Sequence, residues 1–409
     1  MTGRRCAARY GSRMDLADAL VLRTATAADV PGAARLLAER GEPADAVDLE
    51  LVVATDGLEP VAVVVAGDRV VSTLTLLDEV VYIDGIAVPA GQVELVATDP
   101  EFERRGLVRA LMAWGHQRSR DRGHLLQVMI GIPYFYRQFG YTYSMPMAPW
   151  RPLATVPATP ADIVVRQAVV ADIPAMQALQ DEAQSGVDIR MGHTPSCWQW
   201  LVRRGGSEQW VAERGSTVIG VARVLPPEEG SAVVELAAVD QDAAAALLAQ
   251  AASRTQDTVS VQQRPGVAAM LEPLLGQSTD KQEWYYARIE HLAPLLVHLG
   301  PALQARLRAA GMGDEEHEVL LSSWRSHIRF SIGPSGLKLL ADGGPEQAPV
   351  SKGGSGVAHE SLPELLLGPY GALGLEERLP DCYLGRQREL MAALFPPRTA
   401  DLLTFYVPI

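Results

Sequence analysis

Residues 93–141 constrain the fold of this chain more than any other stretch. They begin with the apolar, β-branched run VELVAT, pass through the turn sequence DPEFERRG, and continue with apolar residues at the three- and four-residue spacing of one helix face. The apolar run HLLQVMI then precedes the aromatic sequence FYRQFGY. This order predicts a strand, a basic glycine turn, a helix and a second strand.

The basic turn lies where the first of these strands leads into the helix. A helix start presents unpaired backbone N–H groups and the positive end of the helix dipole, and two arginines add fixed positive charge. We therefore expect a phosphate or pyrophosphate to bind here, held by Arg104, Arg105, Gly106, Leu107 and Val108. The alternative is a solvated helix cap, which is the more common role of an Arg-Arg-Gly sequence taken alone.

The aromatic sequence that follows the second strand adds an independent signal. With the order of elements before it, this sequence resembles the motifs of the Gcn5-related N-acetyltransferases (GNATs). The resemblance implies that the basic turn binds the pyrophosphate of acetyl-CoA and that Tyr136 protonates the leaving thiolate. The family turn reads Gln/Arg-x-x-Gly-x-Gly/Ala, so Glu103 and Val108 depart from it while Gly106 matches.

Amine acetylation also needs groups that polarise the thioester carbonyl and deprotonate the amine. We expect the backbone N–H groups of Val96, Ala97 and Thr98 to polarise the carbonyl. Glu94 is a candidate base because it shares strand parity with Val96 and Thr98, although it could be a merely exposed strand carboxylate. Phe135 and Tyr141 are interpreted as core residues.

Two segments of this chain repeat. Residues 21–31 align without a gap on residues 164–174, and residues 93–99 align on residues 234–240, at separations of 143 and 141 residues. The near-equal separations predict two copies of one fold. The alternative is a pair of unrelated strand and helix starts of similar composition.

The copies differ where the chemistry is expected. After Asp240 the second copy reads QDAAAALLAQAA, without the glycine and arginines of the basic turn. We therefore expect a catalytically inactive second copy that packs on the first and walls the acceptor pocket. Residues 184–206 could form a lid, but Trp198 and Trp200 within them are more often packing residues.

From residue 284 onward the pattern changes to helix, three short strands and further helices. This order resembles a sterol-carrier-protein-like fold, and the whole chain resembles the Eis-type acetyltransferases. The resemblance implies an α/β (α+β) architecture of two tandem GNAT-like mixed-sheet domains followed by a sterol-carrier-like α+β domain. The expected divisions are a flexible extension (1–18), a catalytic domain (19–150), a degenerate copy (151–283) and the third domain (284–409).

The same resemblance implies a catalytic role for the last residue of the sequence. In Eis-type enzymes the C-terminal carboxylate serves as the general base, which points to Ile409, although that family would place an aromatic residue there. Glu94 remains the inner alternative. The segment 405–409 is apolar and could instead be a final strand of the third domain.

Composition limits the partners. The chain has 409 residues, a net charge of −13 and a pI near 5.1, which argues against nucleic acid and fits a cationic ligand. Its three cysteines are far apart and its histidines form no metal motif, so neither disulfides nor a metal is expected. No apolar run approaches about 20 residues, which argues against a membrane span. The expected setting is the cytoplasm.

These observations predict an acetyl-CoA-dependent N-acyltransferase that acts on an amine of a cationic small molecule or of lysine. Hexamers are what the resemblance implies. The alternative is a natural-product enzyme, or a weakened CoA-fold scaffold that binds a small ligand without acetylating an amine.

The first expected domain also gives local predictions. Asp29 should cap a helix whose first turn contains Pro31, and two or three strands should follow between residues 49 and 77. The strands 61–66 and 69–77 should form a hairpin at Gly67-Asp68, and a further short strand should cover residues 80–88.

Overall fold

The computed structural model describes residues 15–16, 20–203, 207–226, 231–278 and 281–404. The chain divides into two compact units. Unit 1 comprises residues 1–77 and 93–121, and unit 2 comprises residues 78–92 and 122–409. Two long strands, β4 (Arg69–Ile83) and β5 (Ile86–Thr98), run through both units.

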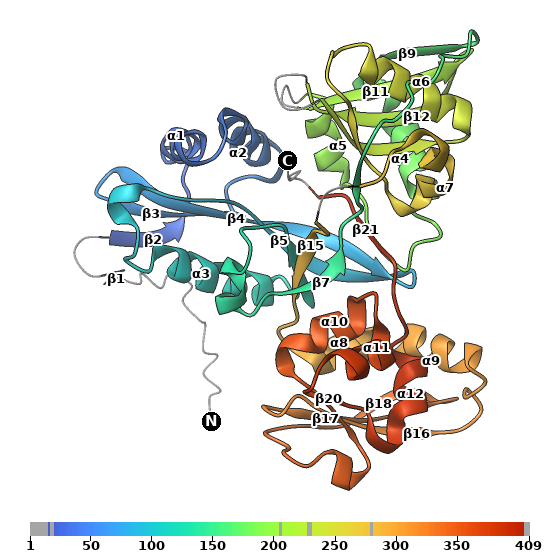
Figure 1. Cartoon of the computed structure of the whole chain (residues 1–409). Helices are drawn as coiled ribbons and strands as arrows, with labels where there is room; N and C mark the ends of the chain where they lie inside the picture. The colour runs from blue at the N-terminus through green and yellow to red at the C-terminus, as the bar shows by residue number, and fades with distance from the viewer. Residues whose placement is uncertain (1–14, 17–19, 204–206, 227–230, 279–280, 405–409) are drawn as a thin grey trace, which may run out of the picture. The chain divides into compact units, whose positions relative to one another are not determined.

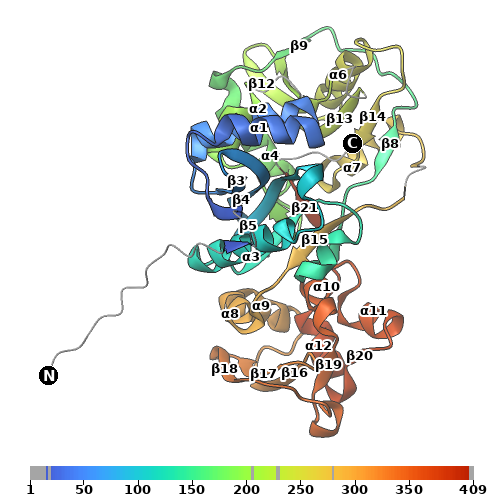
Figure 2. The same cartoon turned by 90° about the vertical axis from the view of Figure 1, so that its left-hand side faces the viewer.

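Unit 1 is a small sheet with helices on both faces. Its antiparallel strands follow the order β1 (Asp15–Leu16), β2 (Leu20–Thr24), β3 (Val61–Ala66) and β4. Helices α1 (Val30–Arg40) and α2 (Pro43–Asp56) cover one face, and α3 (Leu107–Asp121) covers the other (Figures 1 and 2). Because both faces are covered, the continuous apolar run of β3 is buried from Val61 to Val65, and only its last residue, Ala66, is partly exposed.

One local prediction for this unit is wrong, and two of the expected two or three strands between residues 49 and 77 are found. Residues 49–56 continue helix α2, because Pro43 and the Glu42–Asp45 capping box begin a helix that the following leucines and valines extend. Asp29 precedes α1 but makes no side-chain cap. The expected hairpin of β3 and β4 and the place of Pro31 in the first turn are confirmed.

The carboxylate of Asp29 binds Arg23 instead. The Arg23 guanidinium donates to both carboxylate oxygens at 2.5 and 2.8 Å, and the backbone N–H of Thr26 donates to the same carboxylate at 2.7 Å. The same arrangement occurs in unit 2, where Arg166 donates to Asp172 at 2.7 and 2.8 Å. The same Arg–Asp pair thus joins strand to helix at matching positions of the two aligned segments, 21–31 and 164–174. This supports the interpretation of a repeat.

Unit 2 contains three sheets. In the first, the remainders of β4 and β5 are followed by β6, β15 and β7, while β21 pairs in parallel with β10 and β10 pairs with the end of β4. The bounds of these strands are β6 (Leu126–Met129), β7 (Thr142–Pro146), β10 (Ile189–Met191), β15 (Trp284–Arg288) and β21 (Ala400–Leu402).

In this sheet the observed strands differ from one expected strand boundary and one expected domain boundary. The segment 80–88 is not one strand, because Asp84 and Gly85 have φ values of 48° and 78° and turn the chain between β4 and β5. The expected third domain starts at Trp284, yet β15 lies between β6 and β7 of the first sheet. A strand's sequence shows that it is half-buried but does not show which strands flank it.

The second sheet of unit 2 has the order β8-β14-β13-β12-β11-β9. Helix α6 packs on it through its alanine-rich face and forms a core with the inward side chains of the central strands. Helices α4 and α5 follow β9 and β10 in the chain. The bounds are β8 (Trp150–Pro152), β9 (Ile163–Gln167), β11 (Glu208–Arg214), β12 (Thr217–Val224), β13 (Ala232–Ala238), β14 (Ser260–Gln262), α4 (Ile173–Ala183), α5 (Pro195–Leu201), α6 (Gln241–Ala252) and α7 (Ala268–Leu271).

The third sheet has the order β18-β17-β16-β19-β20, and α8 to α12 gather on one side of it (Figures 1 and 2). Its apolar side chains form one continuous core with those of β6, β7 and β15. The bounds are β16 (His317–Ser322), β17 (His327–Gly333), β18 (Gly336–Gly343), β19 (Ser355–Val357), β20 (Cys382–Tyr383), α8 (Leu292–His298), α9 (Gly300–Ala309), α10 (Leu362–Leu367), α11 (Gly371–Arg378) and α12 (Arg388–Leu394).

Of the expected N-terminal extension, Asp15 and Leu16 pair with β2, and the remaining residues lie outside the described part of the chain. Among the described helices, none has both the length and the hydropathy to cross a membrane.

Candidate active site

The basic turn of unit 1 has the backbone shape of a ligand cradle. Arg104 and Gly106 both have left-handed backbone angles, with φ values of 60° and 80°, and α3 begins directly after them. The N–H groups of the first helical turn, here those of Leu107 and Val108, have no acceptor earlier in the helix. A Cβ added at Gly106 would meet no atom within 4 Å, so this part of the turn is open.

Side chains around the turn are ordered by Phe102. The guanidinium of Arg105 stacks on the Phe102 ring at 4.8 Å from its centroid and donates to the carbonyl of Glu101 at 3.2 Å. Arg69 approaches the same ring at 5.6 Å and donates to the Glu101 carboxylate at 3.0 Å. Arg104 and Arg105 are both exposed. The turn therefore presents two solvent-facing cations on an organised loop.

Glu103, which departs from the family pattern, is half of an ion pair. Its carboxylate accepts from Arg40 of α1 at 2.9 Å. The pair neutralises the one acidic residue placed between Phe102 and Arg104. Val108, the other departure, is half-buried beside the buried Leu107.

The expected thioester strand contains one residue with a left-handed backbone. Leu95 has a φ of 50°, and the parallel register of β5 with β6 covers only Ala90 to Gln92, whereas β5 continues to Thr98. A left-handed residue interrupts the alternation of a strand and redirects its backbone groups. The register with β6 therefore does not extend to residues 96–98, the segment expected to bind the acyl carbonyl.

The hydroxyl of Ser72 on β4 contacts the segment 96–98. It donates to the carbonyl of Ala97 at 2.9 Å and lies 2.7 Å from the hydroxyl oxygen of Thr98. Val96 and Thr98 are half-buried. Glu94 is 6% exposed, so the expectation of an exposed strand carboxylate is wrong. The left-handed Leu95 lies between Glu94 and Val96, so regular strand alternation does not by itself group Glu94 with Val96 and Thr98.

Tyr136 lies in unit 2, in the 3₁₀ turn Phe135–Phe139 that follows β6. Its ring packs edge-on against Phe135, Tyr141 and Tyr286, with centroids 5.1, 6.3 and 6.1 Å away. The side chain is 6% exposed. Left-handed residues at Tyr134 and Gly140 bound the turn, and Tyr136 is its buried side chain.

Tyr141 is a core residue, as expected. It is fully buried, its hydroxyl donates to Gln127, and burial raises its pKa above the usual range. Phe135 is only partly buried. Burial also raises the pKa of Tyr286, whose hydroxyl donates to the carbonyl of Ile132 at 3.2 Å. These phenols therefore remain protonated at neutral pH.

Ile409 lies outside the described residues. The chain leading to it is firmly held: β21 pairs with β10, and the buried carboxylate of Asp401 accepts from Arg264 at 2.5 Å and from Gln184 at 2.9 Å. Tyr285 donates to the carbonyl of Leu402 at 3.0 Å. The described residues 400–402 therefore belong to the sheet of β10 and β4. The segment 405–409, for which a final strand of the third domain was the alternative, lies outside the described residues.

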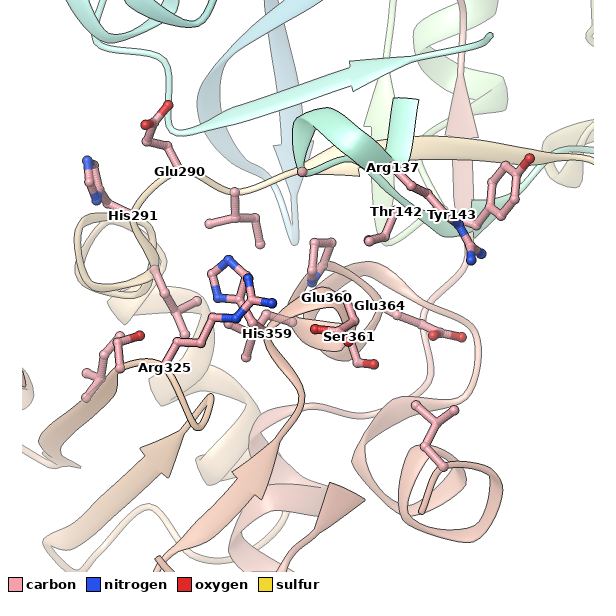
Figure 3. Close-up of a pocket in the computed structure, with 18 of the residues that line it drawn as sticks. Arg137, Thr142, Tyr143, Glu290, His291, Arg325, His359, Glu360, Ser361 and Glu364 are labelled. Carbon is pink, nitrogen blue, oxygen red and sulfur yellow. The ribbon is translucent and has the colours of Figure 1, made fainter. Parts of the chain in front are cut away.

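Sequence reasoning missed a pocket of about 680 Å³ in unit 2. Figure 3 shows Arg137, Thr142 and Tyr143 along one wall and Arg325, His359 and Glu364 along the other. The first wall belongs to the turn and strand after Tyr136, and the second to the third sheet and α10, so tertiary packing alone assembles it. Tyr136 itself does not line the pocket. Burial raises the pKa of Glu364.

The expected lid segment, residues 184–206, is partly built into the core. It contains β10 and α5, and Trp198 and Trp200 are 1% and 2% exposed, which agrees with a packing role. Residues 204–206 lie outside the described part. Among the described residues, no group of three or more His, Cys, Asp or Glu side chains could hold a metal ion.

Comparisons with known proteins agree on the fold. Residues 21–144 match the family model of an acetyltransferase (GNAT) domain. A GCN5-related N-acetyltransferase from Anabaena variabilis is 17% identical, with a TM-score of 0.68 over 94% of this chain and 99% of that one. Eis1 from Mycobacterium abscessus is 16% identical, with a TM-score of 0.61 over 93% of this chain and 98% of that one.

A more distant structure carries a ligand. It is Saccharomyces cerevisiae N-myristoyltransferase with bound myristoyl-CoA, 10% identical, with a TM-score of 0.50 over 68% of this chain and 84% of that one. No curated protein sequence matches this chain. The expected mixed α/β class is thereby confirmed, and solved structures of acetyltransferases resemble this chain over nearly its whole length.

Proposed function

We propose that this protein is an acetyl-CoA-dependent N-acyltransferase that acetylates an amine of a cationic small molecule or of lysine. The observation that carries the proposal is the turn at Arg104 and Gly106, whose left-handed backbone opens onto the 15-residue helix α3. The matched GNAT domain covers this turn and the Tyr136 sequence.

The residues of unit 1 fit an acyl-CoA. Arg104 and Arg105 would pair with the pyrophosphate, and the N–H groups at the start of α3 would donate to it. Residues 96–98 would donate backbone hydrogen bonds to the acyl carbonyl, which stabilises the negative charge that develops on its oxygen. Bound acetyl-CoA would supply the activated thioester.

Two proton transfers complete the chemistry. The amine must lose a proton before it attacks, and we assign this step to the carboxylate of Ile409 or of Glu94. Tyr136 then donates its phenolic proton to the departing thiolate. The excess of acidic residues, a net charge of −13, supports a cationic acceptor. Homo-oligomers, and hexamers in particular, are part of the proposal, and sedimentation velocity would test them.

Thiol release from acetyl-CoA in the presence of a panel of amines tests the assignment. Tyr136→Phe should lower kcat by about 100-fold or more, because a general acid is lost. Tyr134→Phe is the matched control: this phenol is two residues away and 67% exposed, so activity should not change. Equal activity of the two variants would contradict the role of Tyr136.

Calorimetry with CoA alone separates binding from catalysis. Arg105→Ala should weaken CoA binding by about tenfold, since one charge-assisted contact is removed. Arg120→Ala, at the exposed far end of α3, should leave binding unchanged. Unaltered binding in Arg105→Ala would contradict the pyrophosphate site.

The pocket of Figure 3 favours one alternative, a CoA-fold scaffold that binds a small ligand beside the third sheet. Its walls offer both signs of charge, for example Arg325 and Glu364. Tight CoA binding without thiol release across the amine panel would favour this scaffold over the enzyme.

A further inference from the structure

Beside the second sheet of unit 2, a cysteine, a histidine and a glutamate contact one another in series. The sulfur of Cys197 lies 3.4 Å from Nδ1 of His193, and Nε2 of the same ring lies 2.9 and 3.0 Å from the two carboxylate oxygens of Glu235. This order of thiol, imidazole and carboxylate is the arrangement that activates a nucleophilic side chain.

Local structure explains why the three meet. His193 follows β10, and Cys197 lies four residues later in the first turn of α5, where its backbone N–H donates to the Thr194 hydroxyl. Glu235 lies on β13, at the position that the repeat aligns with Glu94. The ring of Trp198 packs edge-on against His193 at 5.0 Å and holds it in place.

The charges facing the cluster favour an ionised Glu235. Burial opposes its ionisation, but His193, Arg223 and Arg264 outweigh burial and hold the pKa of the carboxyl well below its usual range. Arg223 is fully buried and contacts Glu235 at 3.0 Å. Arg264 is itself paired with Asp401. The carboxylate is therefore available to accept the Nε2–H of His193.

This hydrogen bond determines the chemistry of the other ring nitrogen. When Nε2 carries the proton donated to Glu235, Nδ1 of the neutral ring is an acceptor that faces the thiol of Cys197. Transfer of the thiol proton gives a thiolate beside an imidazolium, and the thiolate is the nucleophilic form of cysteine. Cys197 is partly exposed, whereas His193 and Glu235 are shielded from solvent.

We propose that Cys197, His193 and Glu235 form a second nucleophilic site, in the copy that lacks the basic turn, and that it accepts an acyl group from small thioesters. The sulfur of Cys197 bonds to the acyl carbon, the bond from that carbon to the donor sulfur breaks, and the imidazolium of His193 returns its proton to the departing thiolate. The products are S-acyl Cys197 and a free thiol.

The test uses the whole chain and the acetyl thioester of N-acetylcysteamine, which lacks the nucleotide of CoA. Mass spectrometry should find one acetyl group on Cys197, removable by neutral hydroxylamine. His193→Gln should slow this acetylation by about 100-fold, because the general base is lost, and Glu235→Gln should slow it less. Acetylation that is absent from Cys197, or equally fast in His193→Gln, would overturn the proposal.

A second measurement needs no variant. The alkylation rate of Cys197 by iodoacetamide should be half-maximal well below pH ~8.5, the ordinary value for a cysteine thiol. Cys382 is the internal reference, because it is 2% exposed and burial raises its pKa to about 12. A midpoint for Cys197 at or above ~8.5 would contradict the activated thiol.

This site and the proposed amine acetylation can fail independently. Tyr136→Phe should still acquire the acetyl group on Cys197 from the short thioester, and Cys197→Ser should still release CoA in the presence of an amine. Loss of Cys197 acetylation in Tyr136→Phe would show that the modification depends on the first copy, which contradicts a separate nucleophilic site.

Discussion

At the scale of single residues, the size of Gly131 decides where the Tyr136 ring can lie. A Cβ on residue 131 would stand 2.8 Å from Cδ2 of Tyr136 and closer still to Cε2. Real side chains do not approach so closely, so the ring would have to move. The candidate acid is thus positioned by the absence of a methyl group beside it.

Gly131→Ala should therefore displace the Tyr136 ring, lower kcat and destabilise the protein by about 1–3 kcal/mol through overpacking. Gly186→Ala is the control, because its added Cβ meets no atom within 4 Å. Amine-dependent thiol release and urea unfolding measure the two effects. A Gly131→Ala protein with unchanged kcat would show that the ring's place is not critical.

Single residues also determine the response to acid. The hydrogen bonds from Arg23 lower the pKa of Asp29 to about 2, and Arg166 lowers that of Asp172. A carboxyl whose folded pKa is below its unfolded value of ~3.9 stabilises the fold above that value and loses this contribution as pH falls toward the folded pKa.

The free energy of unfolding of the wild type should therefore decrease between about pH 4 and pH 2. In Asp29→Asn it should decrease less steeply, because residue 29 then has no charge to lose. Asp172→Asn should behave in the same way. Urea unfolding at several pH values measures the slopes. Slopes identical to that of the wild type in both variants would contradict a role for these corners in acid stability.

At the scale of elements, β21 is held by charge as much as by backbone pairing. Asp401 and Arg264 are both buried, and their ion pair ties a short strand at the end of the chain to residues far before it in sequence. A buried pair that loses one partner leaves an uncompensated charge, so the anchor is costly to break.

Asp401→Asn should destabilise the protein by about 3 kcal/mol and speed hydrogen exchange in β21. The control is Glu318→Gln, which breaks the exposed pair with Arg329 and should cost less than about 1 kcal/mol. Urea unfolding and exchange by mass spectrometry measure both. Equal effects of the two substitutions would show that burial does not strengthen the anchor.

At the scale of the whole molecule, two strands from the last third of the chain, β15 and β21, pair with strands of the first sheet. β15 inserts between β6 and β7, and the core continues from these strands into the helices above the third sheet. The strand β15 and the apolar side chains after it therefore complete the first sheet and its core.

A chain that ends at Glu283 lacks β15 and leaves β6 and β7 with open edges. Exposed strand edges promote aggregation, so this chain should elute as aggregates in size-exclusion chromatography. A chain that ends at Thr404 retains every described strand and should stay folded, while losing activity if Ile409 is the base. A monodisperse, folded protein ending at Glu283 would contradict the shared core.

Local sequence determined much of this molecule. The basic turn, the strand and helix beside it and the burial of Tyr141 were predicted from periodicity and turn chemistry. The recurring Arg–Asp corner was not predicted, because Asp29 was expected to cap a helix. Only the tertiary structure decided the partners of β15 and β21, the pocket of Figure 3, and the meeting of Cys197 with Glu235. A strand's pattern records which of its faces is buried but not which distant strand lies beside it, because many sequences can supply an apolar neighbour.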